Sequence, residues 1–280
     1  MKKYTKLITA AGLLALAPMA SFASALNFLD VDNPGTFVLT DQLDLTATAG
    51  QFTVDVDFGA DGIMNDGDEF FETVSYLVTS SSLGGGATDF TLSQDYRIDV
   101  SLVGMISGYS NAVGDVTINA DGTINNLDTA LFDVAFAPDP TSIMELFDNK
   151  NPAIPGTLKI ADLLLQSGGN SNIQFVVGQL SGDTTINALI DTNNEPFLST
   201  GDNYIKAADG TSLAGGDDVM TITTASARFL GAGGDAETGI MTIIFQDDQG
   251  STTFVPEPAS LALLGIGLIG LGGLRRRKAA

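Results

Sequence analysis

Apolar and polar side chains alternate along most of the middle of the chain. A period of two places the apolar side chains on one face of a β-strand and is typical of a strand that is buried on one side. Clusters of Gly, Asp, Asn and Ser separate the alternating runs, which indicates an antiparallel β-sandwich or a jelly roll. The predicted strands cover residues 43–48, 52–58, 70–78, 96–102, 132–136, 173–177, 220–222 and 241–245.

Helical periodicity is sparse. Thr141–Asn149 predicts a short helix that begins after a Pro-Thr pair, and residues 160–166 fit either a helical turn or a strand. We therefore expect an all-β body with one or two short helices. A division near Ser167 would give two subdomains, but a single domain is the simpler prediction. Three segments rich in Gly, Ser or Asn are predicted to be loops, at residues 80–86, 167–172 and 231–234.

The first 25 residues have the pattern of a secretory signal peptide. Met1–Lys6 is basic, Leu7–Ala20 is apolar, and Ala23 and Ala25 form a small-residue cleavage site. We expect a signal helix that directs the protein to the Sec export machinery. Signal peptidase would then cleave before Leu26.

The exported body, predicted to span residues 26–254, is strongly acidic. The whole chain has 12 basic and 34 acidic residues. Without the signal peptide and the C-terminal segment, five basic and 33 acidic residues remain, which is a formal charge of −28. A surface of this sign disfavours nucleic acid and anionic lipid as partners. Divalent cations, cationic polymers and neutral glycans are compatible with it.

The sequence contains no His, Cys or Trp. This composition excludes a zinc site built from His and Cys, a Cys nucleophile, a disulfide framework and a Ser-His-Asp triad. A pair of carboxylates can hydrolyse a glycan without these residues, but the sequence indicates no particular pair. We therefore predict a binding or structural role rather than an enzyme.

Two segments, at residues 60–68 and 120–128, share the pattern Ala-Asp-Gly-x-x-Asn-x-x-Asp. Both resemble the calcium loops of dockerin-type modules, which makes calcium a candidate cofactor. The match is partial, because position 12 is Asp rather than Glu, Gly59 occupies position 3 of the first loop, and Thr117 occupies position 1 of the second. Asp-Gly is also a favoured hairpin turn, and a turn that binds no metal is the preferred interpretation of both segments, more strongly for the second. The candidate ligands are Asp57, Asp61, Asn65 and Asp68 in the first loop, and Asn119, Asp121, Asn125 and Asp128 in the second.

A helix breaker, an apolar run and a basic cluster follow one another at residues 255–280. The breaker is Val255, Pro256, Glu257 and Pro258, the run is Leu261–Leu274, and the cluster is Arg275, Arg276 and Arg277. As a helix the run would span about 21 Å, which is less than the roughly 30 Å hydrocarbon core of a bilayer. An ordinary C-terminal anchor is one interpretation, but a temporary anchor fits this short span better. The basic cluster is expected to stay cytoplasmic, with the rest of the protein outside.

The order and position of these elements resemble the PEP-CTERM signal of bacterial surface proteins. The resemblance implies recognition by an exosortase, a membrane enzyme that cleaves near the motif and releases or transfers the rest of the protein to the cell surface. The body also resembles the flocculation-associated PEP-CTERM proteins, in its acidic, Gly- and Thr-rich composition, in the segment Lys159–Gly168 and in a last strand at Ile240–Phe245. That likeness implies a protein that helps cells and extracellular polysaccharide to cohere into flocs or biofilm.

These inferences predict an exported protein that is anchored transiently in the inner membrane and then resides at the cell surface or in the extracellular matrix. One alternative is a secreted glycan- or calcium-binding module without a matrix-building role, which saturable glycan binding would favour. Another is a carboxylate-dependent glycan hydrolase, which the release of reducing ends from the polysaccharide would favour.

Overall fold

The structure is a computed structural model that describes residues 25–48, 51–136, 138–150, 158–177, 184–192, 203–211, 213, 218–224, 227–246 and 249–256. Within these residues the protein forms 17 strands and two 3₁₀ turns, η1 (Gly59–Asp61) and η2 (Leu127–Thr129). No helix in these ranges is both long and apolar enough to cross a membrane. The strands are β1 (Leu26–Leu29), β2 (Phe37–Thr40), β3 (Gln42–Ala47), β4 (Gln51–Asp57), β5 (Glu69–Ser82), β6 (Tyr96–Asn111), β7 (Thr117–Ile118), β8 (Ile124–Asn125), β9 (Ala130–Phe136), β10 (Ile143–Asp148), β11 (Leu158–Ile173), β12 (Thr184–Asp191), β13 (Ile205–Ala207), β14 (Asp218–Thr224), β15 (Arg228–Asp235), β16 (Ile240–Gln246) and β17 (Gln249–Pro256).

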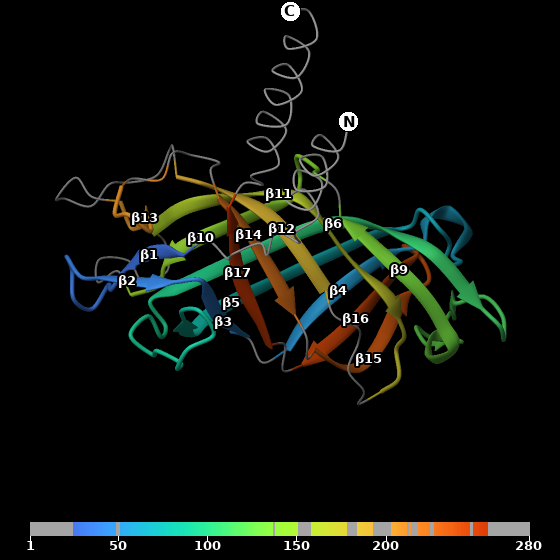
Figure 1. The fold of residues 1–280 in the computed structure, drawn as a ribbon. Helices are drawn as coiled ribbons and strands as arrows, with labels where there is room; N and C mark the ends of the chain where they lie inside the picture. Colours follow the sequence, from blue (N-terminus) through green and yellow to red (C-terminus); the bar gives the residue numbers. More distant parts are fainter. Residues whose placement is uncertain are drawn as a thin grey trace, which may run out of the picture.

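Twelve strands form one large antiparallel sheet that closes on itself (Figure 1). The long strand β5 pairs with β6, and β6 pairs with β10 along one half and with β9 along the other. Both of these pair with β11, and the ladder continues through β12, β14, β17 and β3 back to β5. The two walls of the closed sheet therefore face each other, as the two layers of a sandwich do. The all-β, antiparallel prediction is confirmed.

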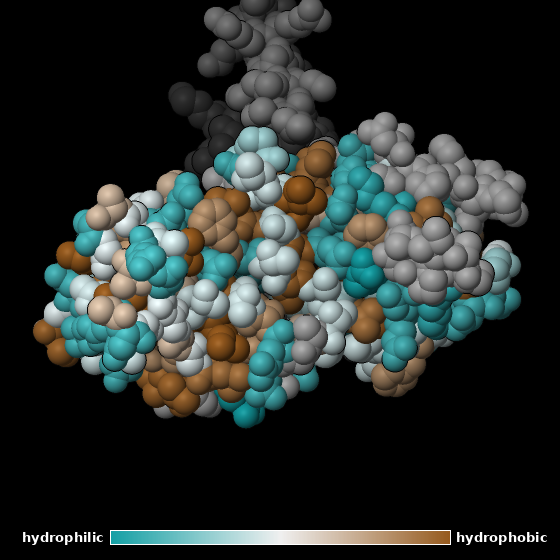
Figure 2. Space-filling model, turned by 180° about the vertical axis from the view of Figure 1, so that it is seen from behind, coloured by the Kyte–Doolittle hydropathy of each residue, from teal (hydrophilic) through white to brown (hydrophobic). Residues whose placement is uncertain are grey.

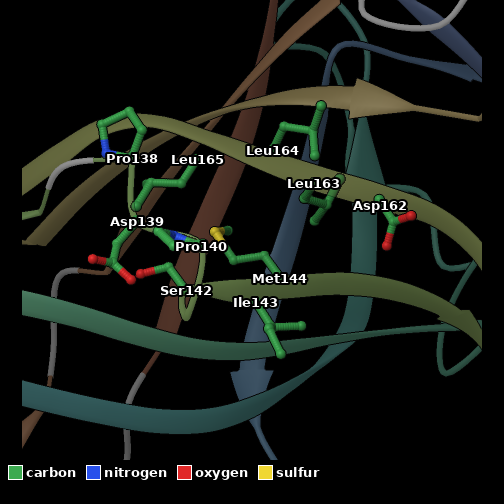
Figure 3. A pocket seen from close by; sticks show the side chains of 10 residues that line it. All are labelled: Pro138, Asp139, Pro140, Ser142, Ile143, Met144, Asp162, Leu163, Leu164 and Leu165. Atoms are coloured by element: carbon green, nitrogen blue, oxygen red, sulfur yellow. The ribbon is translucent and has the colours of Figure 1, made fainter.

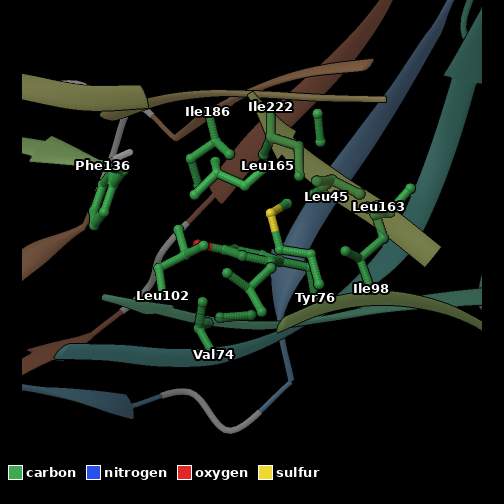
Figure 4. Close-up of a cluster of buried hydrophobic side chains, with 14 of the residues drawn as sticks. Leu45, Val74, Tyr76, Ile98, Leu102, Phe136, Leu163, Leu165, Ile186 and Ile222 are labelled. Carbon is green, nitrogen blue, oxygen red and sulfur yellow. The ribbon is translucent and has the colours of Figure 1, made fainter. Parts of the chain in front are cut away.

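The core lies between these walls. Figure 4 shows side chains from both walls pointing toward one another, among them Tyr76 of β5, Ile98 of β6, Leu163 of β11 and Ile222 of β14. Each of these four side chains is at most 2% exposed. Burial of alternate residues explains why these strands alternate in sequence, because only one face of each contacts the core.

Two additions extend the closed sheet. The three-stranded sheet β13–β1–β2 lies at one end of the molecule, and β4, β16 and β15 continue outward from the first half of β5 (Figure 1). Aromatic rings fill the space under the second addition. The ring of Phe175 lies 5.3 Å from that of Phe132 and 5.1 Å from that of Phe229, between centroids. Phe245 of β16 joins the same cluster at 5.8 Å from Phe175.

Seven of the eight predicted strands are present, at β3, β4, β5, β6, β9, β14 and β16. The predicted strand at 173–177 is wrong beyond Ile173, where β11 ends, although Phe175 is buried. The predicted helix at Thr141–Asn149 is also wrong, because residues 143–148 form β10. β10 pairs with β6 on one side and β11 on the other, and those two ladders outweigh a helical preference. Residues 160–166 are strand, within β11.

Two predicted loops lie inside strands, at 167–172 in β11 and at 231–234 in β15, and the first three residues of the predicted loop 80–86 belong to β5. The glycines in β11 and β15 are places where another segment approaches closely. A Cβ on Gly169 would lie 2.3 Å from the carbonyl oxygen of Val134, and one on Gly234 would lie 2.7 Å from the Ile118 side chain. Gly is therefore required by packing at these positions rather than by a turn.

The outer surface mixes apolar and polar residues. Figure 2 shows brown, apolar areas broken up by teal and white ones across the rear face. Single large apolar side chains are exposed, such as Phe90 at 68% and Met105 at 54%. The predicted signal helix and the predicted C-terminal helix both lie outside the described residues.

Candidate functional site

The last strand of the body leads directly into the predicted C-terminal tail. β17 lies between β14 and β3 in the interior of the large sheet. Its ladder with β14 runs to the end, where Val255 pairs with Val219 and Pro256 pairs with Asp218. Val255 and Pro256 of the predicted breaker are therefore strand residues, whereas Glu257, Pro258 and the three arginines lie outside the described residues.

Phe254 connects this strand to the other end of the body. Its side chain is fully buried, and its ring centroid lies 5.5 Å from that of Phe28 in β1. Phe28 in turn contacts Tyr96 edge to face, at 5.4 Å. Leu26, the residue predicted to follow signal cleavage, is the first residue of β1 and is also buried, whereas Ala23 lies outside the described residues and Ala25 is half-buried. The two ends of the predicted mature body thus belong to one packed cluster.

Buried charges lie next to this cluster. The carboxylate of Asp95, which is fully buried, contacts the ammonium of Lys150 at 2.5 Å and accepts the backbone N–H of Val31 at 3.0 Å. The same ammonium lies 2.6 Å from Asp32 in the β1–β2 connection. Burial raises the pKa of Asp95, while Lys150 and the N–H of Val31 oppose the rise. Lys150 therefore links the small sheet to the start of β6.

A second buried carboxylate supports the same junction. Asp148, at the end of β10, accepts the backbone N–H of Lys150 at 2.9 Å and the hydroxyl of Tyr204 at 3.1 Å. Burial, followed by the charge and hydrogen bond of Asp148, raises the pKa of Tyr204 to about 12. The hydroxyl of Tyr96 donates to the carbonyl of Leu29 at 2.6 Å. These contacts hold β1 and β13 against the large sheet.

The first candidate calcium loop is closed by its own side chains. Asp57 accepts the N–H of Gly59, and Asp61 accepts the N–H of Ile63. Asp68 accepts the N–H of Asn65 at 2.7 Å, and the side-chain amide of Asn65 donates to Asp61 at 3.1 Å. Burial raises the pKa of Asp68, the N–H of Asn65 lowers it, and the charges of Asp61 and Asp57 raise it further.

The second loop is a small hairpin between β7 and β8. The side chains of Asn119 and Asn125 exchange hydrogen bonds at 3.0 and 2.8 Å. Asp121 accepts both the N–H and the hydroxyl of Thr123, which lowers the pKa of Asp121. Asp128, the last candidate ligand, belongs to η2.

The hydrogen-bond pattern of the Asp121 turn occurs at three other positions in the described residues. Asp89, Asp139 and Asp209 each accept the N–H and the hydroxyl of the Thr two residues later. The pKa of each of these carboxylates is lowered by those bonds. None of the three belongs to a calcium-loop pattern, so this arrangement is a turn device of the fold. Asp121 performs the same local task.

The two loops and a third turn meet at one end of the molecule. Ile63 and Thr117 form an isolated bridge, and the N–H of Met64 donates to the carbonyl of Val116. The turn between β15 and β16 contacts both loops, because Gly234 donates to Gly122 at 2.9 Å and Phe58 donates to Gly239 at 3.0 Å. We call residues 57–69, 115–128 and 235–239 the acidic turns, since they carry ten Asp and Glu and no Lys or Arg.

Side-chain hydrogen bonds join Asn65 to Asp61 in the first loop and Asn119 to Asn125 in the second. Across the residues that the structure describes, no group of three or more Asp and Glu has the arrangement of a metal site. The carboxylate oxygens of Asp57, Asp61, Asp68 and Asp121 instead accept backbone N–H groups that close turns. Calcium binding stays a prediction that a titration must decide.

A hollow of about 430 Å³ lies between β10 and β11, beside the β9–β10 connection (Figure 3). Its lining is mostly apolar, with Ile143 and Leu164 exposed at its edge. The two carboxylates that line it are both engaged, Asp139 by Thr141 and Asp162 by the ammonium of Lys159 at 2.8 Å. The hollow therefore offers mainly apolar contact, with two carboxylates that are hydrogen-bonded within the protein.

Comparison with known proteins identifies the tail. A family model described as the PEP-CTERM protein-sorting motif matches residues 254–278. The protein carries a PEP-CTERM sorting motif. No curated protein and no solved structure matches it. The PEP-CTERM motif implies an exported, cell-surface-associated protein that an exosortase processes.

Two features of this end were missed by sequence reasoning. The first three residues of the PEP-CTERM match are part of an interior strand. The sequence does not predict this strand, because Thr252, Phe254 and Pro256 do not form an apolar–polar alternation with their neighbours. The Asp95–Lys150 pair also had no signal, because Asp95 precedes a strand as many solvated loop carboxylates do. At the other end of the molecule, the acidic turn at residues 235–239 did have a sequence signal, because Asp235 and Gly239 bracket it just before an alternating run.

Proposed function

We propose that the exported body is a structural component of the extracellular matrix, which helps cells and exopolysaccharide to cohere into flocs or biofilm. In this proposal it acts without catalysis. The observation that supports the proposal is the placement of two features at opposite ends of the body: the PEP-CTERM tail is attached at one end, and the acidic turns lie at the other.

Strand register supports this placement of the tail and the acidic turns at opposite ends. β5 begins at Glu69, opposite Asp57, among the acidic turns, and ends at Ser82, opposite Gln42 of β3. Gln42 in turn pairs with Thr253 of β17, next to the tail. At about 3.3 Å per residue, the 14 residues of β5 separate the two ends by roughly 40 Å. While the tail holds the body at the membrane, the acidic turns lie at the end away from the attachment point.

The basic residues of the body lie mostly at the end opposite the acidic turns. Four of the five basic residues of the body, Arg97, Lys150, Lys159 and Lys206, lie at the tail-proximal end. None of the five ion pairs found among the described residues involves the acidic turns. A surface of one sign attracts divalent cations, which bridge it to acidic polysaccharide or to a neighbouring body.

The experiment is the settling of a strain that lacks the gene, beside its parent and a complemented strain, with polysaccharide output measured in parallel. We expect the mutant to disperse while it still makes polysaccharide. Unchanged settling would contradict the matrix role. Saturable glycan or calcium binding by the purified body, together with unchanged settling, would instead support a secreted binding module.

Two complementing variants sharpen the result. One changes Asp61, Asp121 and Asp235 to Asn, which keeps each turn-closing oxygen but removes three charges from the acidic turns. Its matched control changes Asp89, Asp139 and Asp209 to Asn, because these carboxylates close the same kind of turn elsewhere. We expect the first variant to settle more slowly than the control at equal surface abundance.

A further inference from the structure

One edge of the large sheet is open beside the acidic turns. β15 lies at the margin of the sheet and, among the described strands, forms a ladder only with β16 (Figure 1). The N–H of Gly234 points away from β16, because it donates to the carbonyl of Gly122 in the β7–β8 hairpin. Backbone groups of an antiparallel strand alternate between its two sides, so Ala232 directs its N–H and carbonyl outward as well. No backbone group of the described residues bonds to Ala232 from that side.

A hollow of about 560 Å³ lies beside this edge. Gly231 and Ala232 of β15 line it, and no residue of β16 does, so it lies on the outer side of β15. Most of its lining is apolar and includes Val177, which is 70% exposed, while Asp121 and Asp128 supply two exposed carboxylates. A Cβ on Gly231 would meet no atom within 4 Å. We call this open space between β15 and the two carboxylates the edge hollow.

The charges along this edge are complementary to those of a second copy. β15 begins at Arg228, the basic residue of the body that does not lie at the tail-proximal end. Arg228 is exposed, and none of the five ion pairs among the described residues involves it. When two β15 strands lie side by side and antiparallel, the start of each lies beside the end of the other. Arg228 of one copy then faces the edge hollow of the other copy, where Asp121 and Asp128 lie.

We propose that two copies of the body associate through β15, edge to edge and antiparallel, with Arg228 of each copy bound in the edge hollow of the other. A two-fold pair uses the same surface on both copies, and a free strand edge supplies main-chain hydrogen bonds to an added strand. A foreign basic strand would also suit the carboxylates, but it would leave Arg228 without one. The proposal does not rest on the matrix role.

The association is expected to be weak. The bulge between Phe229 and Gly231 and the bond from Gly234 to the hairpin limit the paired length. The charge of −28 on each body also opposes association. Salt screens such distant repulsion more than it screens charges in contact. The dimer should therefore form at high protein concentration and at moderate ionic strength.

Sedimentation equilibrium of the mature protein, purified from its own cells, tests the association. Concentrations up to about 200 µM are needed because short interfaces bind weakly, and about 150 mM NaCl screens the repulsion between bodies. We expect a monomer–dimer equilibrium. Monomer at every concentration would overturn the proposal. A synthetic peptide of alternating Lys and Val is the probe for a foreign strand, and its binding to a protein that stays monomeric would overturn the proposal too.

Two charge reversals identify the surface. Arg228→Asp places two carboxylates in contact and Asp128→Arg places two guanidinium groups in contact, so each alone should weaken the dimer by about tenfold or more. Asp128 is chosen because the carboxylate of Asp121 closes a turn. An equimolar mixture of the two variants should restore the dimer, because each Asp then meets an Arg on the other copy. Such recovery requires two copies, and no recovery would overturn the proposal.

Two further variants separate pairing from folding. Glu237→Arg makes the same charge change in an acidic turn outside the edge hollow, so it should associate at least as well as the wild type. A loss equal to that of Asp128→Arg would overturn the proposal. Ala232→Pro removes an outward N–H and leaves the ladder with β16, so it should abolish the dimer at an unchanged melting temperature. If a charge reversal does not fold, Ala232→Pro still decides, because a dimer that persists in it would overturn the proposal.

Discussion

Replacement of Lys150 by Met should destabilise the protein by stranding a buried charge. The ammonium of Lys150 lies 2.5 Å from the carboxylate of Asp95, which is 0% exposed. Met keeps most of the apolar stem but removes the cation. Loss of one partner of a buried ion pair costs about 3–5 kcal/mol. Protonation of Asp95 limits the loss, because neutralising a carboxyl of ordinary pKa costs about 4 kcal/mol at pH 7. We expect about 3–4 kcal/mol, or a melting temperature lower by roughly 10 °C.

The pH dependence of the loss follows from the raised pKa of Asp95. A carboxyl with a folded-state pKa above its unfolded value of 3.8 contributes stability that is fully present below that value and is lost as pH rises through the folded pKa. Without Lys150 the folded pKa rises further. The gap in unfolding free energy between wild type and Lys150→Met should therefore be smaller near pH 4.5 than near pH 7.5.

Urea denaturation of the purified protein at both pH values measures this gap. Asp32→Asn is the control, because Asp32 is 68% exposed in its pair with Lys150 and such a pair is worth at most about 1 kcal/mol. Adding Asp95→Asn to Lys150→Met should restore stability near pH 7.5. The reasoning would be refuted if Lys150→Met matched Asp32→Asn, or if the second substitution gave no recovery.

Three further predictions concern packing, titration and charge. Gly169→Ala should cost about 3 kcal/mol or more in urea denaturation, because its Cβ would lie 2.3 Å from the carbonyl oxygen of Val134; Gly210→Ala, with no atom within 4 Å of the new Cβ, should lose only about 1–2 kcal/mol to its positive φ. Stability should fall between pH 10 and about pH 12, because the pKa of Tyr204 is raised to about 12 in the folded protein above its unfolded value of 10.0. A phenolate absorbance titration of Tyr204→Phe should lack the ionisation that Tyr204 contributes at this pH. Raising NaCl from about 20 to about 200 mM should raise the melting temperature, because salt screens the self-repulsion of a body of charge −28; a lower value would contradict this.

Alternation predicted strands well where one face of a strand is buried. β4 could be predicted directly, because it alternates apolar core residues with polar outer ones. β16 could be predicted because Met241, Ile243 and Phe245 recur with a period of two and are buried, although Ile240 and Ile244 on its outer face are apolar as well.

β10 could not be predicted in this way, since Ile143, Met144 and Phe147 fit a helical face equally well. Its conformation is decided by β6 and β11, which flank it in space but lie far from it in sequence. Non-local pairing of this kind leaves little trace in local spacing.

Glycine misled the prediction for a related reason. In β15, Gly233 and Gly234 looked like a loop, but Gly234 lies under the side chains of Ile118 and Ile124 from the β7–β8 hairpin. The Asp-Gly turns themselves were predictable from local chemistry, including those at Asp61 and Asp121. Their meeting at one end of the molecule was not, because it depends on how β5, β6 and β15 bring distant segments together.

The overlap between the sorting motif and β17 changes how sorting must be studied in this protein. Phe254 to Pro256 serve the PEP-CTERM match and the sheet at once. Phe254→Ala would reduce surface display by destabilising the body, because this side chain is buried, even if the exosortase still recognised the tail. Glu257, Pro258 and the cluster Arg275–Arg277 belong to the same match but lie outside the described residues, and we expect their substitution to leave the melting temperature unchanged. Loss of surface display with an unchanged melting temperature therefore separates recognition from folding only for substitutions beyond Pro256.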